Sequence, residues 1–283
     1  MTYPNPMIDA RAAARLATQR RVVWLDCRFS LADYSAGRRA WRRARIPGAQ
    51  HLDMEIDLSG RKTGSNGRHP LPSVAAMTRS LRRAGVNASD TLVLYDDNMA
   101  GAARAWWLSV FFGLTDVRVL DGGLAAWRSA GFPIDTRPSQ AVSEGDISLT
   151  NGDSDLIVTV DALARHVRRG DVCLVDAREA VRYRGEQEPI DPVPGRIPGA
   201  INLPWTTALL HGRMRSATAQ RRRWRHIPST VTPIMYCGSG VTASVNLLSM
   251  AIAGRPLGQL YAGSYSEWVA DSSRRIARDS AVA

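Results

Sequence analysis

The sequence predicts an α/β protein built from two successive copies of one domain, each a parallel sheet with helices on both faces. Two observations support this prediction. Four short motifs occur twice in the same order, which indicates a tandem duplication. Within each half, short β-rich runs alternate with stretches of helical periodicity, a pattern typical of parallel sheets. The 283 residues are enough for two ordinary domains.

The repeated motifs keep an almost constant spacing. In order, they are VVWLDCR (22–28) with VCLVDAR (172–178), ARIPGAQHL (44–52) with GRIPGAINL (195–203), LVLYDDNMAGA (92–102) with PIMYCGSGVTA (233–243), and VLDGGLAAW (119–127) with LYAGSYSEW (260–268). Pro47 and Pro198 are 151 positions apart, whereas Tyr95 and Tyr236 are 141 apart. The first half therefore carries about ten extra residues around 57–72.

The second half illustrates the predicted alternation. We expect strands at 172–176, 200–203, 233–236 and 257–261, and helical or partly helical segments at 159–169, 207–224, 241–253 and 264–271. The polar stretch rich in Gly, Ser and Asp after the first half is typical of a linker. The expected division is a non-catalytic domain at 1–137, a linker at 138–155 and a catalytic domain at 156–283.

Composition narrows the classes of function. Three cysteines are an odd, low number that argues against a disulfide framework and favours the cytoplasm. We find neither an apolar secretory signal near the N-terminus nor a run of about 18 apolar residues, so no membrane span is expected. The cysteines and five histidines lack the spacing of metal ligands, and no metal or other cofactor is expected.

A net charge of +11 does not by itself indicate a nucleic-acid partner. The arginines are scattered, and the densest run, RRRWR at 221–225, is interpreted as a solvated helix face. The field of such a protein favours small anions. We therefore expect a small anionic substrate, with neither nucleic acid nor a membrane as partner.

One cysteine stands where a predicted strand turns into a predicted helix. Cys237 ends the strand, Gly-Ser-Gly follows, and helical periodicity begins directly afterwards. The N–H groups of such a loop form an anion cradle at a helix start, where a thiolate is stabilised and nucleophilic. The first half has Asp96 at the matching position, while Cys27 and Cys173 belong to apolar strands and are predicted to be inert.

Two chemistries use a cysteine in this kind of loop. Phosphate-ester hydrolysis requires an arginine six residues after the cysteine, where this chain has Ala243 and has no arginine up to residue 254. Sulfur transfer requires a tight loop around one added sulfur atom. The sequence favours sulfur transfer.

Taken together, these motifs resemble the two-domain rhodanese family of thiosulfate and 3-mercaptopyruvate sulfurtransferases. The resemblance covers nearly the whole chain, and the loop CGSGVTA at 237–243 is most similar to the mercaptopyruvate branch. The thiosulfate branch has two basic residues after its cysteine, where this chain has Gly238 and Ser239. The resemblance implies that Cys237 accepts a sulfur atom as a persulfide and passes it to cyanide, a thiol or a thioredoxin-like protein. Loop amides, among them those of Gly240, Val241 and Thr242, would hold the persulfide.

The same resemblance implies further site residues. In the mercaptopyruvate branch a serine, a histidine and an aspartate form a proton relay, and these match Ser239, His69 and Asp57. His69 lies on the extra residues of the first half, from which it would reach across the domain interface.

The resemblance also implies two arginines that clamp the donor's carboxylate and carbonyl groups. Arg184 matches the first, Ile190 stands at the second position, and Arg196 is the candidate that would compensate. Gly238 and Ser239 favour 3-mercaptopyruvate as donor, whereas Ile190 removes one of its contacts. Thiosulfate therefore stays open as the alternative donor.

Two further interpretations stay open. The frame can act as a binding or scaffold module with little turnover, as is expected of the half that carries Asp96. A phosphatase is a more distant alternative, because the required arginine is missing.

Overall fold

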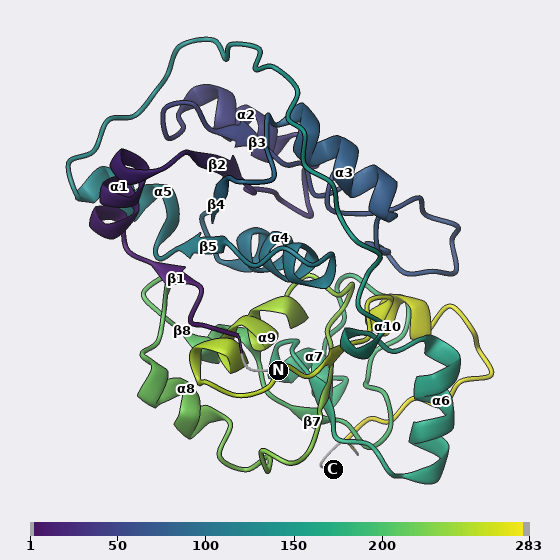
Figure 1. Cartoon of the computed structure of the whole chain (residues 1–283). Helices are drawn as coiled ribbons and strands as arrows, with labels where there is room; N and C mark the ends of the chain where they lie inside the picture. The colour runs from purple at the N-terminus through teal and green to yellow at the C-terminus, as the bar shows by residue number, and fades with distance from the viewer. Residues whose placement is uncertain (1–2, 280–283) are drawn as a thin grey trace.

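The computed structural model describes residues 3–279 as two α/β halves, each built on a parallel sheet (Figure 1). The strand order is β1-β5-β4-β2-β3 in the first half and β11-β10-β6-β7 in the second. The order β5-β4-β2-β3 of the first sheet matches β11-β10-β6-β7 of the second, and β1 is an extra edge strand. The two halves are therefore copies of one arrangement, as the repeats predict. The strands are β1 Met7–Ile8, β2 Val22–Asp26, β3 Gln50–His51, β4 Thr91–Tyr95, β5 Val117–Leu120, β6 Leu174–Asp176, β7 Ile201–Asn202, β10 Ile234–Tyr236 and β11 Gln259–Leu260.

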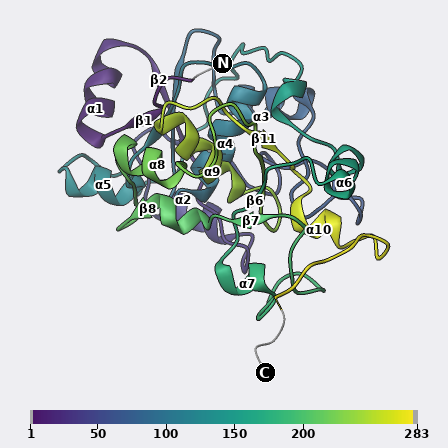
Figure 2. The same ribbon diagram turned by 90° about the horizontal axis from the view of Figure 1, so that it is seen from below.

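Helices cover both faces of each sheet. In the first sheet, Val23 and Leu25 join the apolar cluster under α3 and α4, while Trp24 joins the cluster under α1 and α5. Helices α1 and α5 lie at one edge of the molecule, and α6 and α10 lie at the opposite edge (Figure 2). The helices are α1 Ala10–Gln19, α2 Ala36–Arg43, α3 Val74–Arg83, α4 Ala100–Phe111, α5 Gly123–Ser129, α6 Val160–Arg169, α7 Ala180–Arg184, α8 Ala217–Arg223, α9 Ala243–Ile252 and α10 Ser264–Trp268.

Helices α4 and α9 form the contact between the halves. Every residue of both helices is buried, and both helices are apolar on nearly all sides. They belong to one continuous apolar cluster that extends from the first sheet to the second. The two halves therefore share a core, with α4 and α9 between the sheets (Figure 1).

The helical prediction for 207–224 is correct only in its last third. The 3₁₀-helix η2 (Trp205–Ala208) leads into a hairpin of β8 (Leu209–Leu210) and β9 (Arg213–Met214), and α8 follows. His211 and Gly212 at the hairpin turn have φ angles of 49° and 73°. A two-residue turn with both φ angles positive suits the twist of a hairpin, and this local preference overrides the helical pattern.

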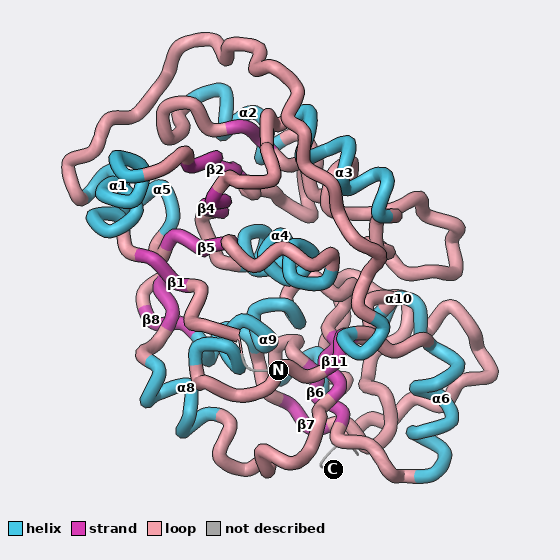
Figure 3. Tube along the Cα trace, viewed as in Figure 1, coloured by secondary structure: helices cyan, strands magenta, loops and turns pink. Residues whose placement is uncertain are grey.

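The segment from 138 to 153 contains no helix or strand and precedes the 3₁₀-helix η1 (Ser154–Leu156). Figure 3 shows it running as an extended loop from the end of the first half to the second. It lies against the first half, because Ile147 is buried and its N–H donates to the carbonyl of Val86 at 3.2 Å.

The repeated sequence motifs make equivalent contacts in both halves. Arg28 donates to the carbonyl of Ala44 at 2.7 Å, and Arg178 donates to the carbonyl of Gly195 at 2.7 Å. Each arginine also pairs with the aspartate two positions before it. These contacts hold the RIPG turns next to the ends of β2 and β6.

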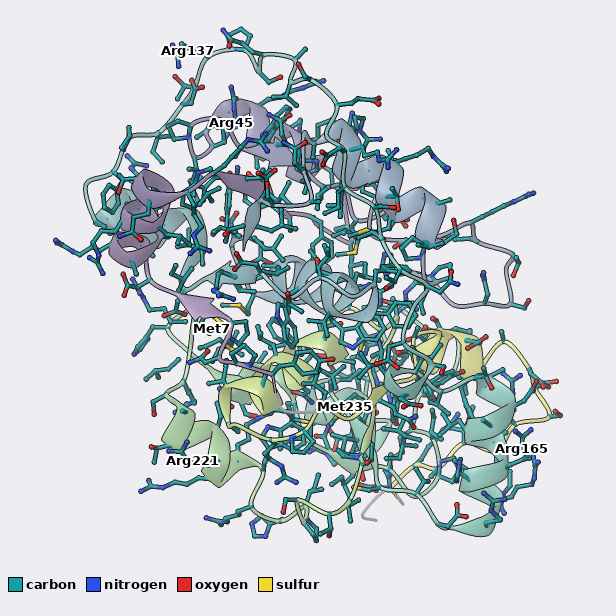
Figure 4. The ribbon with its side chains drawn as sticks, in the orientation of Figure 1. Met7, Arg45, Arg137, Arg165, Arg221 and Met235 are labelled. Atoms are coloured by element: carbon teal, nitrogen blue, oxygen red, sulfur yellow. The ribbon has the colours of Figure 1, made fainter. Side chains whose placement is uncertain are left out.

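Exposed arginines occur on different parts of the molecule. Arg137, Arg165 and Arg221 lie far apart on the molecule (Figure 4). Within the run at 221–225, the expected solvated face includes Arg221 but not Trp224, which is fully buried. Among residues 3–279, the structure contains no helix with both the length and the apolar character that a membrane span requires.

Candidate active site

Cys237 follows the last residue of β10, and its side chain is only 2% exposed. The N–H of Gly240 donates to the sulfur atom at 3.1 Å. Gly240 has a φ of +79°, and a Cβ atom there would lie 2.5 Å from the carbonyl oxygen of Ala262. Only glycine fits this position, and the tight loop turns the amide toward the sulfur.

The first half shows what the same loop binds when its first residue is acidic. The Asp96 carboxylate accepts hydrogen bonds from the N–H groups of Met99 and Gly101, both at 2.7 Å, and of Ala102 at 3.2 Å. These groups open helix α4, where an anion is favoured by unpaired N–H groups and the helix dipole. In the second half, within the described residues, no side chain caps the start of α9.

A cavity of about 590 Å³ opens beside Cys237 between the two halves. Gly238, Ser239, Val241 and Thr242 of the cysteine loop line it. The first half contributes Phe29, Ser30, Leu31, Ala32, Arg68, Asn98 and Ala100, and the second half contributes Arg178, Glu179, Val181, Arg182, Gln187, Pro189, Ile190 and Trp205. The volume is suited to a small organic or inorganic ligand.

A hydrogen-bonded chain reaches the cysteine loop from the first half. His69 Nδ1 lies 2.8 Å from Ser239 Oγ, and His69 Nε2 lies 2.8 Å from a carboxylate oxygen of Glu55. The extra residues of the first half thus bring His69 across the interface, as expected. The carboxylate is Glu55 and not Asp57, which is a correction to the sequence prediction. Asp57 instead accepts hydrogen bonds from Ser80 and Arg83 and from the N–H of Asp53.

Burial and hydrogen bonding determine the charges of the hydrogen-bonded side chains Ser239, His69 and Glu55. Desolvation lowers the pKa of His69 to about 4, although the carboxylate of Glu55 acts in the opposite direction. Burial opposes ionisation of Glu55, but hydrogen bonds from Lys62 and His69 outweigh it and hold the pKa of Glu55 below its usual range. At neutral pH the hydrogen-bonded side chains of Ser239, His69 and Glu55 are therefore a hydroxyl, a neutral imidazole and a carboxylate.

The arginines of the cavity differ from those predicted. Arg184 forms a half-exposed pair with Glu186, and Arg196 pairs with Asp279; neither lines the cavity. Arg182 does line it, because residues two apart on a helix point to different sides. It pairs with Glu188 and Asp191, at 2.7 and 3.0 Å.

Arg68 is another cavity arginine that the sequence analysis missed. It comes from the first half and pairs with Asp191. A Cβ atom built on Gly238 would lie 2.5 Å from Arg68 Nη2, so this guanidinium sits directly over the cysteine loop. Its position next to His69 in the sequence is the signal by which it could have been found.

The two remaining cysteines do not line the cavity. Cys27 is fully buried, and burial holds the pKa of its thiol well above the usual value. Cys173 is half-buried, and desolvation raises its pKa as well. Among the described residues, no group of three or more His, Cys, Asp and Glu side chains is arranged to hold a metal ion.

Comparison with known proteins gives this arrangement a family. The description "Rhodanese-like domain" matches residues 9–130 and again residues 159–271. The chain is similar to a probable 3-mercaptopyruvate sulfurtransferase of Pseudomonas aeruginosa, with 43% identity over 98% of this chain and 99% of the relative. It is also similar to a putative thiosulfate sulfurtransferase of Mycobacterium tuberculosis, with 37% identity over 96% of each chain.

Solved structures give the same result. The crystal structure of the 3-mercaptopyruvate sulfurtransferase SseA from Escherichia coli superimposes with a TM-score of 0.81 at 28% identity, covering 92% of this chain and 99% of that one. The chain thus belongs to the rhodanese family. Within the family it groups with the two-domain sulfurtransferases.

We predict that His69 titrates far below an ordinary histidine, because burial disfavours its charged form. NMR of the imidazole C–H signals should give a midpoint of about 4, against about 6.5 for an exposed histidine. The unfolded chain then binds this proton more readily, so stability falls as the pH drops from about 6.5 toward 4. A His69 midpoint of 6 or above would contradict this description of the site.

Proposed function

We propose that the protein is a sulfurtransferase that carries a sulfane sulfur as a persulfide on Cys237. The observation that carries the proposal is the hydrogen bond from the Gly240 N–H to the Cys237 sulfur, at the mouth of an amide cradle. In the first half the corresponding N–H groups hold a carboxylate. The cradle is therefore of a kind that accepts an anion.

The two side chains have comparable reach. A persulfide places its terminal sulfur two bonds from Cβ, along Cβ–Sγ–Sδ, and aspartate places its oxygens two bonds from Cβ, along Cβ–Cγ–Oδ. Since Cys237 and Asp96 occupy matching positions, a terminal persulfide sulfur would reach the region that the Asp96 oxygens occupy in the first half. We infer that the second half binds the persulfide as the first half binds Asp96.

The reaction has two balanced halves. With thiosulfate, the Cys237 thiolate attacks the outer sulfur, the donor S–S bond breaks, and sulfite leaves with the bonding electrons. With 3-mercaptopyruvate, the Cys237 thiolate attacks the donor sulfur and forms an S–S bond, while the donor C–S bond breaks and its electrons leave on the enolate of pyruvate. The donor thiol loses its proton, and the enolate carbon gains one to give pyruvate. In the second half-reaction, an acceptor nucleophile attacks the terminal sulfur and restores the Cys237 thiolate.

The Ser239–His69–Glu55 chain suits the proton transfer that 3-mercaptopyruvate requires. The carboxylate accepts the Nε2–H of His69, which leaves Nδ1 free to accept a proton from the hydroxyl of Ser239. A neutral histidine that a carboxylate orients presents a free ring nitrogen in position to accept this proton. This favours 3-mercaptopyruvate as donor, while thiosulfate needs no proton transfer and stays an alternative.

The acceptor is a thiol, cyanide or a thioredoxin-like protein in this proposal. The cavity opens between the halves, and Ile190 on its wall is 45% exposed, so an acceptor can approach the cysteine from outside. In this proposal the donor is a small anion that binds in the cavity with its negative charge toward the N–H groups of the cysteine loop.

The first test is the intact mass of the protein after brief exposure to each donor. The wild type should gain one sulfur atom, cyanide should remove it, and Cys237→Ser should gain none, because the nucleophile is absent. A Cys27→Ser variant serves as control and should load normally. An unchanged mass with both donors would refute the persulfide and favour a binding module.

The second test separates Glu55 from Asp57. Glu55→Gln should lower turnover of 3-mercaptopyruvate by about 100-fold, within the range of general-base effects, and should spare sulfur loading from thiosulfate. Asp57→Asn should change neither reaction, because the Asp57 carboxylate bonds to Ser80, Arg83 and the Asp53 N–H and not to His69. Steady-state assays with both donors check this, and equal losses in the two variants would contradict the assignment of Glu55.

The third test concerns the cavity arginines. Arg182→Met removes a positive charge from the cavity wall and leaves Glu188 and Asp191 with less compensation, so KM for anionic donors should rise about tenfold, a change of about 1.4 kcal/mol. Arg184→Met, two positions away and outside the cavity, is the matched control and should leave KM unchanged. The reverse outcome would restore Arg184 as the donor-binding residue.

A further inference from the structure

Arg104 is a fully buried arginine on α4, the inner helix of the non-catalytic half. Its guanidinium faces backbone carbonyls: Nη2 lies 3.1 Å from the carbonyl oxygen of His69 and 3.5 Å from that of Leu58, and Nη1 lies 3.4 Å from that of Gly240. The side chain thus reaches across the interface to the underside of the cysteine loop.

No carboxylate neutralises Arg104 within residues 3–279, where the structure places it in no ion pair. Every other arginine near the thiol has an acidic partner. Arg68 pairs with Asp191, Arg182 with Glu188 and Asp191, and Arg178 with Asp176 and Glu188. A buried cation without a counter-charge is costly, so an anion held near it is strongly favoured.

Among the described residues, the acidic group that acts electrostatically on Arg104 is the Cys237 thiol. Gly240 lies between the two groups, since its N–H donates to Cys237 Sγ at 3.1 Å while its carbonyl accepts from Arg104. Burial lowers the pKa of Arg104 to about 10, and the negative charge of Cys237 acts against that shift. At neutral pH the guanidinium is charged and coupled to the sulfur.

We propose that Arg104 is a positioning residue that serves as the buried counter-cation of the sulfur anion on Cys237, supplied by the half that has Asp96 at the position matching this cysteine. It acts through the loop, and it holds the thiolate and then the persulfide in their charged forms. This inference rests on the proposed function of Cys237 but concerns the ionisation of the sulfur, which is measurable without any donor.

The remaining groups around the thiol leave Arg104 as the unbalanced charge. His69 is neutral at pH 7, Ser239 is uncharged, and Arg68, Arg178 and Arg182 are paired with carboxylates. The loop amides contribute partial charges that do not change with pH.

The test is the pH dependence of Cys237 alkylation by iodoacetamide, followed by mass spectrometry of the peptide that contains Cys237. In Arg104→Met the midpoint should rise by about one pH unit or more, so that alkylation at pH 7 is about tenfold slower. Arg104→Lys keeps the charge and should restore most of the reactivity. A structural role alone would slow Met and Lys variants alike.

Arg223→Met is the matched control. Arg223 is half-buried, and it donates to the carbonyls of Leu203 and Pro204 and to Asn246 Oδ1. It should destabilise the protein without moving the alkylation midpoint. A midpoint in Arg104→Met equal to that of wild type would overturn the proposal, even if the donors still load sulfur onto Cys237.

Should Arg104→Met not fold, Arg104→Gln retains a hydrogen-bond donor without the charge and takes its place. Should neither fold, the stabilities of wild type and Cys237→Ser are compared from pH 6 to 9. The wild type should gain relative stability as the pH rises, because the folded state holds the thiolate beside a cation. Parallel pH profiles of the two proteins would overturn the proposal.

Discussion

The packing of α4 against α9 is the constraint on which the site depends. Both helices are buried along their whole length, and the apolar cluster around them runs without interruption from one sheet to the other. This contact fixes the cysteine loop at the start of α9 relative to the first half. Only with that fixed placement can His69 meet Ser239 at 2.8 Å from a distant part of the chain.

Comparison of the two halves distinguishes the backbone that forms the site from the side chain that reacts there. Both halves have a parallel strand that ends in a tight loop, and both loops aim N–H groups at the residue after the strand. In the first half the Asp96 carboxylate satisfies these groups and caps α4. In the second half a thiol takes that place, so the same backbone is available to an anion that forms and disappears during a reaction.

The sequence predicts the site residues that lie in or beside a repeated motif. It does not distinguish between two candidate residues that are two positions apart. Cys237 and Ser239 belong to a motif that occurs in both halves, so aligning the two copies places them at the end of a strand. His69 lies on the extra residues that distinguish the first half from the second. Glu55 and Asp57 were interchanged because the direction of a side chain in a short turn depends on tertiary contacts. Arg182 and Arg184 were interchanged because α7 is too short to show its apolar face.

Arg104 is a residue whose importance could have been inferred from the sequence. The helix AGAARAWWLSVF is apolar except for this arginine and a serine, and a lone charge in a fully buried helix must find partners across the interface. Its partners are carbonyl groups that belong to His69, Leu58 and Gly240. The net charge of +11 therefore says little about anion binding here, since most cations near the thiol are paired. Burial, which removes the competing solvent, makes one unpaired arginine more effective than many exposed ones.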